Sequence, residues 1–455
     1  MKRKIVVLGG GISGYGSAIL AKKKGFDTFL TDMGKIADKF KARLDEWGVE
    51  YEEGGHSEER IMDANEVIKS PGIPDTAPIV KRLRERGIPI ISEIEFASRY
   101  KGVAKTICIT GSNGKTTTTS LIYKIMRDAG RKVSLGGNIG ESFAYSVATE
   151  KNFWYVLELS PFQLDGMTKF RADVGVLMNI TPDHLDRYDY KFENYAASQM
   201  RITQNQSSAD AFIYSADDDM TRQMLDKMDS SLRARQLPFA INTAIASGDG
   251  DAVLEGYTFT ASVGKQSVTI DTRKMQIHGM HNIYNAMAAA LATLAAGVEP
   301  RVIKRSIYDF SPVEHRLEPA GERNGIRWIN DSKATNVDSV WYALESMQQP
   351  TVWIAGGTDK GNDYTPLKEF ARRKVKALIC MGLDNAKLKR DFDGIIPVIE
   401  DCSSLDEAMR AAERHATEGD TVLLSPACAS FDLFRNYEER GRLFKQWVKE
   451  NILDK

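Results

Sequence analysis

The chain has 455 residues, a formal net charge of -1, 42% hydrophobic residues and 27% charged residues. This length suggests roughly two to four domains, each large enough to bury its own core. A balanced charge gives no electrostatic reason to expect a nucleic acid or an anionic membrane as a partner.

Targeting and redox signals point to the cytoplasm. The basic start Met1–Lys4 is followed by only four apolar residues before Gly9, which is too short for a secretory signal. No stretch approaches the roughly 20 apolar residues that span a bilayer. The four cysteines form no Cys-x-x-Cys pair, which argues against a zinc site or a disulfide framework. We expect a cytoplasmic monomer with no membrane insertion and no nucleic-acid partner.

The first segment, residues 1–101, alternates between strands and helices. Strands are expected at Lys4–Leu8, Asp27–Thr31, Glu66–Lys69 and Pro89–Ile91, and a helix at Ser13–Lys24. Short apolar strands separated by helices are typical of a parallel sheet covered by helices. We therefore predict an N-terminal Rossmann-like domain.

The second segment, residues 102–311, has a similar pattern with one difference. Strands are expected at Ala104–Thr110, Phe153–Leu157 and Val174–Ile180, and helices at Thr116–Ala129 and Asn282–Ala296. Alternation rich in Thr and Val over Ala252–Ile277 indicates an antiparallel strand or two. The sheet of this domain is therefore expected to be mostly parallel.

The third segment, residues 312–455, again alternates strand and helix. Its expected strands are Arg327–Asn330, Thr351–Ala355, Ala377–Met381 and Thr421–Ser425. The predicted fold class is α/β, with three consecutive domains of which the last is also Rossmann-like.

A glycine-rich turn, Gly111–Thr116, lies between the expected strand Ala104–Thr110 and the following helix. Backbone N–H groups at a helix N-terminus bind phosphate, Lys115 adds a positive charge, and the Thr116 hydroxyl suits Mg²⁺. The strict pattern GxxxxGK[ST] fails, because Ile109 stands at its first glycine. A short Gly-Lys-Thr turn is common by chance, but its place between strand and helix predicts a P-loop-type ATPase domain in the centre of the chain.

A second glycine cluster, Gly9-x-Gly11-x-x-Gly14, follows the first expected strand. Asp32 ends the next strand, where an acidic residue contacts a ribose hydroxyl in dinucleotide sites. The cluster alone is compatible with NAD, with a single nucleotide diphosphate, or with a tight turn that needs glycine for packing. Two nucleotide sites in one chain favour a two-substrate enzyme over a simple dehydrogenase.

Taken in order, several short motifs resemble the Mur ligase family, the ATP-dependent amino-acid-adding enzymes of peptidoglycan synthesis. They cover nearly the whole chain: Gly111–Thr116, Gly137–Gly140, Glu158–Ser160, Asp183–Asp186, His281-Asn282 with Asn285, His315-Arg316, and Asn330–Asn336. The segments Asp331–Asn336, Leu424–Asp432 and Ser70–Ile73 most resemble the members that add D-glutamate, and the Asp-Asn-Pro-Arg motif of the meso-diaminopimelate-adding member is absent.

The resemblance implies three small-molecule substrates and Mg²⁺. The first domain would bind UDP-N-acetylmuramoyl-L-alanine, the second ATP with Mg²⁺, and the third D-glutamate. An ATP-dependent ligase of this kind activates a carboxylate as an acyl phosphate and then stabilises a tetrahedral intermediate.

The residues predict part of the chemistry directly. Lys115 would neutralise phosphate charge, and Glu158 follows an apolar strand whose carboxyl end faces the ligand crevice, where it suits Mg²⁺. His184 follows the strand ending at Thr181, and the resemblance assigns it to a second metal ion or to the substrate carboxylate. Asn138 is a plausible contact of the acyl group or phosphate. Catalytic candidates are Lys115, Asn138, Glu158, His184, Arg316 and Lys333.

The resemblance completes the set of binding candidates. For ATP these are Gly111, Ser112, Asn113, Gly114, Lys115, Thr116, Thr117, Asn282, Asn285, Arg316 and Asp331. For the UDP-substrate they are Gly11, Ile12, Ser13, Gly14, Asp32, Ser70, Pro71, Gly72 and Asn138. For D-glutamate, whose carboxylates need cations and hydroxyl or N–H donors, they are His184, Lys333, Thr335, Lys360, Ser430 and Tyr437. Metal candidates are Thr116, Glu158 and His184.

The chain departs from the family pattern at three places. Gln199 stands where the family often has a lysine modified to a carbamate that helps to hold a second Mg²⁺, and glutamine cannot be modified in that way. Tyr437 replaces a phenylalanine, and Met33-Gly34 replaces a Thr-Arg pair that contacts the UDP portion. The second metal site and the recognition of uracil therefore do not follow from the resemblance.

Three alternatives remain open from the sequence. Another amino-acid-adding member or a folylpolyglutamate synthase shares most of the motifs. A nucleotide-binding regulatory module without catalysis is disfavoured, because Lys115, Glu158, His184 and Lys333 are all present. An NAD-dependent oxidoreductase is supported by the first glycine cluster only.

Overall fold

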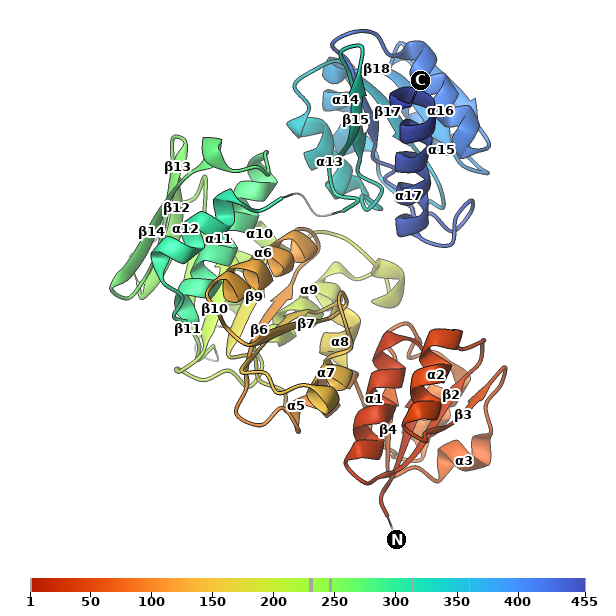
Figure 1. Cartoon of the computed structure of the whole chain (residues 1–455), viewed down its shortest axis with the longest axis vertical. Coiled ribbons are helices and arrows are strands. Elements are labelled where there is room, and N and C mark those ends of the chain that lie inside the picture. The colour runs from red at the N-terminus through yellow and green to blue at the C-terminus, as the bar shows by residue number, and fades with distance from the viewer. Residues whose placement is uncertain (1, 229–231, 245–247, 312–313, 360, 455) are drawn as a thin grey trace. The chain divides into compact units, whose positions relative to one another are not determined.

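The computed structural model describes residues 2–228, 232–244, 248–311, 314–359 and 361–454 (Figure 1). By internal contacts the chain divides into two compact units. The first unit is Met1–Met275 with Tyr284–Phe310, and the second is Gln276–Ile283 with Ser311–Lys455. Within the described residues no helix is both long and apolar enough to cross a membrane.

The N-terminal sheet is parallel throughout and has the strand order β3-β2-β1-β4-β5. Its strands are β1 (Lys4–Leu8), β2 (Asp27–Asp32), β3 (Glu50–Glu53), β4 (Glu66–Lys69) and β5 (Ile90–Ile91). Strand β1 lies in the middle because its four residues from Ile5 to Leu8 are apolar and bury both faces.

Alternate residues of β1 face opposite layers of helices. Ile5 and Val7 pack with residues of α1 (Ile12–Lys23), while Val6 and Leu8 pack with residues of α3 (Glu58–Met62) and α4 (Pro78–Glu85). The period of two along a strand explains this division. Helix α2 (Asp38–Glu46) contacts α1 on its side of the sheet, as Figure 1 shows.

The central sheet has the order β14-β13-β12-β11-β10-β9-β6-β8-β7. Strands β6 to β12 run parallel, and β12, β13 and β14 form an antiparallel meander. The bounds are β6 (Lys105–Thr110), β7 (Val133–Gly137), β8 (Trp154–Glu158), β9 (Val174–Leu177), β10 (Ala211–Ser215), β11 (Arg235–Ala240), β12 (Gly250–Glu255), β13 (Thr258–Val263) and β14 (Gln266–Asp271).

All but one of the helices described in this region follow the glycine turn, and α5 precedes it. Helix α6 (Lys115–Asp128) starts directly at the turn and packs against α12 (Pro300–Tyr308). The others are α5 (Glu93–Ser98), α7 (Phe143–Thr149), α8 (Pro161–Asp165), α9 (Phe192–Met200), α10 (Asp219–Met228) and α11 (Met280–Ala295). Helix α8 begins in a capping box, in which Ser160 and Gln163 satisfy each other's backbone N–H groups and fix the chain just after Glu158.

The C-terminal sheet has the order β15-β16-β20-β17-β18-β19 and is parallel except at β15. Its strands are β15 (Glu318–Arg323), β16 (Ile326–Asn330), β17 (Thr351–Ala355), β18 (Val375–Met381), β19 (Val398–Cys402) and β20 (Thr421–Leu424). Its helices are α13 (Val337–Ser346), α14 (Lys368–Lys374), α15 (Ala386–Phe392), α16 (Leu405–His415) and α17 (Tyr437–Val448).

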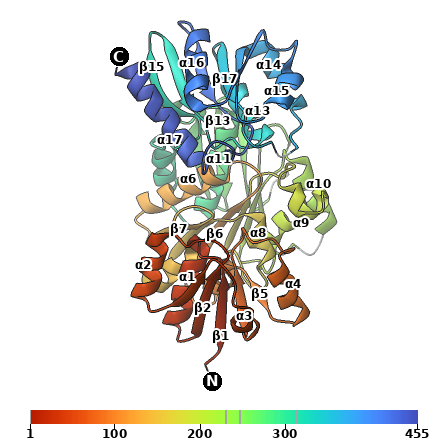
Figure 2. The ribbon, with the colours of Figure 1, turned by 90° about the vertical axis from the view of Figure 1, so that its right-hand side faces the viewer.

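Two apolar clusters lie on opposite faces of this last sheet. One joins Trp353 and Leu378 to α13, α14 and α15, and the other joins Val352 and Ile379 to α16 and α17. Figure 2 shows α16 and α17 on one side of β17 and α14 and α15 on the other. The predicted fold class is confirmed: the described residues form three α/β sheets with mostly parallel strands, one in each predicted segment. The boundaries at residues 101 and 311 stay predictions.

Candidate active site

The turn Gly111–Thr116 connects β6 to α6, at the carboxyl end of a central parallel strand. Gly111 and Gly114 have φ of 130° and 84°, values that favour glycine. A Cβ on Gly111 would lie 3.0 Å from the Asn179 carbonyl oxygen, so both conformation and space require glycine there. The turn therefore has the shape and position that place a phosphate at the start of a helix.

Asn179, which follows β9, holds the first half of the turn. Its carbonyl oxygen accepts from Ser112 N at 3.0 Å, and its Oδ1 accepts from Asn113 N at 2.9 Å. Its side-chain amide donates back to the Asn113 carbonyl at 3.2 Å. Asn179 was not among the sequence candidates, although it lies at the carboxyl end of a strand next to the turn.

The Lys115 side chain folds over the turn. Its Nζ donates to the carbonyl oxygens of Gly111 at 2.5 Å and Ser112 at 2.9 Å. The ammonium group is thereby held against the backbone of the turn, where its charge suits an anion.

Glu158 connects three candidates. It ends β8, is 1% exposed, and accepts from the Thr116 hydroxyl at 2.8 Å and from Asn138 Nδ2 at 2.8 Å. The backbone N–H of Asn138 also donates to the Glu158 carbonyl at 2.8 Å. The structure thus brings the turn, the acidic strand end and the Gly137–Gly140 loop into one cluster.

The donor set around Glu158 fits Mg²⁺. A hydroxyl and a carboxylate are hard oxygen ligands, and Mg²⁺ commonly binds one or two carboxylates together with substrate phosphates and water. Among the described residues no group of three or more His, Cys, Asp or Glu side chains is placed to hold a metal ion. A cation here would therefore depend on phosphate oxygens for part of its coordination.

Gln199 lies in the last turn of α9 and is fully buried. Its Oε1 accepts from the Thr110 hydroxyl at 2.6 Å and from Gly111 N at 3.2 Å, and its Nε2 donates to the Tyr195 hydroxyl at 2.9 Å. The sequence identifies Gln199 as a departure from the family pattern at a metal site. Its contact with the turn Gly111–Thr116, named the phosphate turn below, is visible only in the structure.

His184 occupies a left-handed backbone position, with φ of 51°. Its backbone N–H donates to Asp183 Oδ1 at 2.9 Å, and its Nε2 lies 3.7 Å from Asp183 Oδ2. Its ring meets Phe162 of α8 edge-on, with 5.3 Å between centroids. These contacts place His184 beside the segment that follows Glu158, and its metal and D-glutamate roles stay predictions.

Asn285, in α11, lies against the turn. Its Oδ1 accepts from the Thr118 hydroxyl at 3.1 Å, and a Cβ on Gly114 would come within 2.5 Å of it. Thr117, the next candidate along α6, is buried. Asn282 belongs to the second unit and donates from Nδ2 to the His278 carbonyl at 2.8 Å.

The first glycine cluster forms a tight turn from β1 into α1. Gly9 has φ of 95°, Gly11 is the N-cap of α1, and a Cβ on Gly14 would meet the Gly9 carbonyl at 1.8 Å. Asp32 accepts from Gly10 N at 2.6 Å and from Gly34 N at 2.7 Å. One Asp32 oxygen therefore fixes the turn and the other fixes the segment just after β2, in addition to the ribose role that the sequence predicts.

The remaining UDP-substrate candidates lie around this turn. Ile12 and Ser13 begin α1, and the Ile12 side chain is 43% exposed. Ser70, Pro71 and Gly72 follow β4, whose neighbour in the sheet is β1. The carboxyl ends of β1 and β4 therefore bring the two candidate segments to the same edge of the sheet, where ligands of doubly wound folds bind.

In the second unit, Asp331 follows β16 and is fully buried. It accepts from the Ser425 hydroxyl at 2.8 Å and from Leu317 N at 3.2 Å, and Arg316 lies 3.8 Å away. Burial raises the pKa of the Asp331 carboxyl to about 6, although Arg316 and these hydrogen bonds oppose the shift. Arg316 and Asp331, both predicted for ATP, are thus neighbours.

The predicted D-glutamate residues of this unit lie on three segments. Lys333 Nζ stands 5.5 Å from the centre of the Tyr437 ring, and Tyr437 opens α17. Thr335 N donates to the Lys333 carbonyl at 2.9 Å, and Ser430 is buried after β20. Lys360 lies outside the described residues.

Arg440 joins these segments and was missed by the sequence analysis. Its guanidinium is 1% exposed and donates to Ser332 Oγ at 3.0 Å, to the Ser332 carbonyl at 2.8 Å and to the Cys428 carbonyl at 3.3 Å. Burial lowers its pKa to about 10. Arg442, two positions along the same helix, is exposed, so no local signal distinguishes the two arginines.

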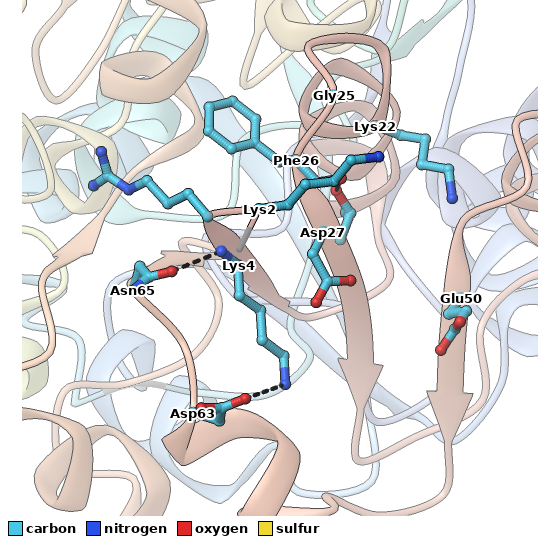
Figure 3. A pocket seen from close by; sticks show the side chains of 11 residues that line it. Lys2, Lys4, Lys22, Gly25, Phe26, Asp27, Glu50, Asp63 and Asn65 are labelled. Carbon is cyan, nitrogen blue, oxygen red and sulfur yellow. Dashed lines mark hydrogen bonds and ion pairs between the residues drawn. The ribbon is translucent and has the colours of Figure 1, made fainter.

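Figure 3 shows a pocket at the opposite edge of the N-terminal sheet. It is lined by Lys2, Lys4, Asp27 and Asp63 among others, and Lys4 pairs with Asp63 at 3.2 Å. These residues lie at the amino ends of β1 and β2, away from the carboxyl ends that carry the candidates. Since ligands of open α/β sheets bind at the carboxyl ends, the pocket is not the candidate site.

Three family models match the chain in sequence order. Residues 3–92 match the model described as "Mur ligase MurD-like, N-terminal domain", residues 109–293 match "Mur ligase middle domain", and residues 315–428 match "Mur ligase, glutamate ligase domain". The candidates around Glu158 fall in the middle region, and Lys333 falls in the last.

Curated relatives match over nearly the whole chain. A UDP-N-acetylmuramoylalanine–D-glutamate ligase of Bacteroides fragilis is 53% identical, covering 98% of this chain and 100% of the relative. The protein of the same name from Christiangramia forsetii is 50% identical, covering 99% and 100%. A solved pseudomurein peptide ligase type C from Methanothermus fervidus shares the fold, with TM-score 0.63 and 20% identity over 98% and 100% of the two chains. The chain therefore belongs to the Mur ligase family.

Proposed function

We propose that this chain is a ligase that joins D-glutamate to UDP-N-acetylmuramoylalanine at the expense of ATP, in the synthesis of peptidoglycan precursors. The relatives of 50% identity and above are UDP-N-acetylmuramoylalanine–D-glutamate ligases by name, which supports the two substrates. The observation that carries the chemistry is the cluster in which Glu158 bonds both Thr116 of the phosphate turn and Asn138. This cluster links a nucleotide-binding element to a second polar group outside the turn.

The cluster suits transfer of a phosphoryl group to a carboxylate. The turn and Lys115 would orient the terminal phosphates of ATP, so that the substrate carboxylate attacks the γ-phosphorus and ADP leaves. Thr116 and Glu158 would hold Mg²⁺, which would supply positive charge against the phosphates. Asn138 would hold the acyl end of the UDP-substrate near that position, because its amide is fixed by Glu158.

The second half of the reaction needs an amine donor. The amino group of D-glutamate would attack the acyl carbon, and phosphate would leave. We assign Lys333, Thr335, Ser430 and Tyr437 to the recognition of D-glutamate, with Lys360 and His184 as further candidates. An ammonium group and hydroxyls are the donors that two carboxylates require.

Arg316, Asp331, Asn282 and Asn285 are assigned to ATP. The enzyme is proposed to act as a cytoplasmic monomer.

The test measures ADP release by the purified chain. ATP, Mg²⁺ and UDP-N-acetylmuramoyl-L-alanine are supplied with single amino acids: D-glutamate, L-glutamate, L-lysine, L-alanine or meso-diaminopimelate. We expect ADP release, with a matching amide product by mass spectrometry, for D-glutamate alone. Release that depends on a different amino acid would replace the proposed substrate, and no release with any of them would contradict ligase activity.

A further inference from the structure

The amide of Gln199 links helix α9 to the start of the phosphate turn. The side chain is fully buried, and its oxygen and nitrogen face different partners. The orientation of the amide follows from the partners. Gly111 N–H can only donate, so the atom that faces it at 3.2 Å must be the amide oxygen.

This orientation sets the direction of a chain of hydrogen bonds. Gln199 Nε2 donates to the Tyr195 hydroxyl at 2.9 Å, so the Tyr195 proton points to Ser112 Oγ, 2.8 Å away. Ser112 Oγ also accepts from Thr181 N at 2.9 Å, and it donates its own hydrogen bond to the Thr181 carbonyl at 2.8 Å. In this arrangement the Tyr195 and Ser112 hydroxyls each accept one hydrogen bond and donate another.

The two ends of the amide therefore hold consecutive residues of the turn. Its oxygen fixes the Gly111 N–H directly, and its nitrogen fixes the Ser112 hydroxyl through Tyr195. We propose that Gln199 is a positioning residue of the ATP site, which fixes the first two residues of the phosphate turn for binding of the nucleotide. The inference rests on the proposed function only in that the turn binds ATP.

A glutamine is suited to this position by its combination of one acceptor and one donor. Methionine has a similar length but makes neither bond. Lysine has donors only, so it cannot accept from the Gly111 N–H. Because the site is buried, no water can replace the partner that the Gly111 N–H would lose, and the Tyr195 hydroxyl would lose the donor that orients it toward Ser112. The expected consequence is a displaced turn with the domain still folded.

The experiment compares Gln199→Met with Gln206→Met. Gln206 is a matched control, because it is also buried in the same sheet region and donates to the Ala172 and Ala211 carbonyls at 3.0 Å. Binding of a non-hydrolysable ATP analogue with Mg²⁺ is measured by calorimetry in the full chain. Kinetic constants for each substrate are measured in parallel. Circular dichroism monitors folding.

We expect Gln199→Met to weaken nucleotide binding by about tenfold, the equivalent of one to two lost hydrogen bonds. Gln206→Met is expected to bind as the wild type, although both variants lose thermal stability. Binding by Gln199→Met within about twofold of wild type would overturn the inference. An equal loss of nucleotide binding in Gln206→Met would also overturn the inference, because the effect would then come from general destabilisation.

A second variant covers the case in which Gln199→Met does not fold. Tyr195→Phe removes one hydroxyl and breaks the chain between Gln199 and Ser112, and it should weaken nucleotide binding about threefold. Unchanged binding by Tyr195→Phe would contradict the nitrogen half of the inference. Because the binding assay contains no amino acid, a wild type that binds ATP but ignores D-glutamate would refute the proposed function and leave this inference to be judged by its own variants.

Discussion

The Thr116 hydroxyl donates to the Glu158 carboxylate across 2.8 Å, although 42 residues separate them in the chain. The same carboxylate accepts from Asn138, so one buried acid connects three segments. These segments meet because β6, β8 and β7 are neighbouring parallel strands, whose carboxyl ends lie at one edge of the sheet.

Replacing Glu158 tests whether its charge is needed. Glu158→Gln keeps the size of the side chain, but it removes the anionic ligand that a divalent cation prefers. We expect turnover to fall by roughly a hundredfold, because the reacting phosphate loses its positioning. The readout is ADP release across a Mg²⁺ titration. Glu150→Gln, an exposed residue beyond α7, is the control. Turnover by Glu158→Gln equal to that of the control would remove Glu158 from the site.

Replacing Lys115 tests whether the ammonium group that lies over the turn is needed. Lys115→Ala is expected to abolish ADP formation while the circular dichroism spectrum is retained, because it removes the charge that we propose orients the phosphates. Lys124→Ala, on the same helix but paired with Asp128 at 2.8 Å, should keep its activity. If Lys115→Ala retains wild-type turnover, the turn does not act as proposed.

Bicarbonate provides a separate test of position 199. A carbamate forms on lysine and not on glutamine, so the rate should be the same with added bicarbonate as in carbonate-free buffer. Gln199 is engaged by Thr110, Gly111 and Tyr195, which leaves its amide in a structural role. A strong stimulation by bicarbonate would show that a different residue supplies a carbamate.

The buried carboxyl of Asp331 should make the free energy of unfolding depend on pH. Its pKa is raised from 3.8 to about 6 by burial, so the folded state binds more protons than the unfolded state between these values. The contribution of Asp331 to the free energy of unfolding is therefore greatest below pH 4 and is lost as the pH rises through 6, by about 3 kcal/mol.

The measurement is denaturant unfolding of the wild type and of Asp331→Asn between pH 4 and pH 7. The asparagine does not titrate. The free energy of unfolding of the wild type should therefore fall relative to that of Asp331→Asn as the pH rises over this range. The exposed Asp393→Asn serves as the control and should parallel the wild type. Parallel curves for wild type and Asp331→Asn would contradict the raised pKa.

Replacing Arg440 should change the KM for D-glutamate and not the KM for ATP. It ties Ser332, next to Lys333, to Cys428, two residues before Ser430. Arg440→Lys keeps the charge but loses the planar set of donors. We expect KM for D-glutamate to rise by about tenfold, the equivalent of one or two lost hydrogen bonds. KM for ATP should change little. Arg442→Lys, on the exposed face, should leave both unchanged. Equal increases in both constants would indicate a general loss of structure.

Much of the fold could be predicted because the strands that carry the site are local apolar runs. The predicted bounds of β1, β4 and β17 agree with the structure, and those of β6 and β8 differ by one residue. Strands whose composition opposes the strand pattern were not predicted. These include β3, which is mostly glutamate, β7, which ends in two glycines, and β11, which contains Pro238. They are stabilised by parallel neighbours and not by their own propensity.

The sequence by itself determined the phosphate turn and the acid at the end of β8, because each is set by residues adjacent in the chain. Only the tertiary structure decided what those residues contact. It showed that Asn179 holds the turn, that Asp32 accepts from Gly10 N, and that Gln199 faces Gly111. Such partners lie tens of residues apart, and their pairing follows from strand order, which no local pattern encodes.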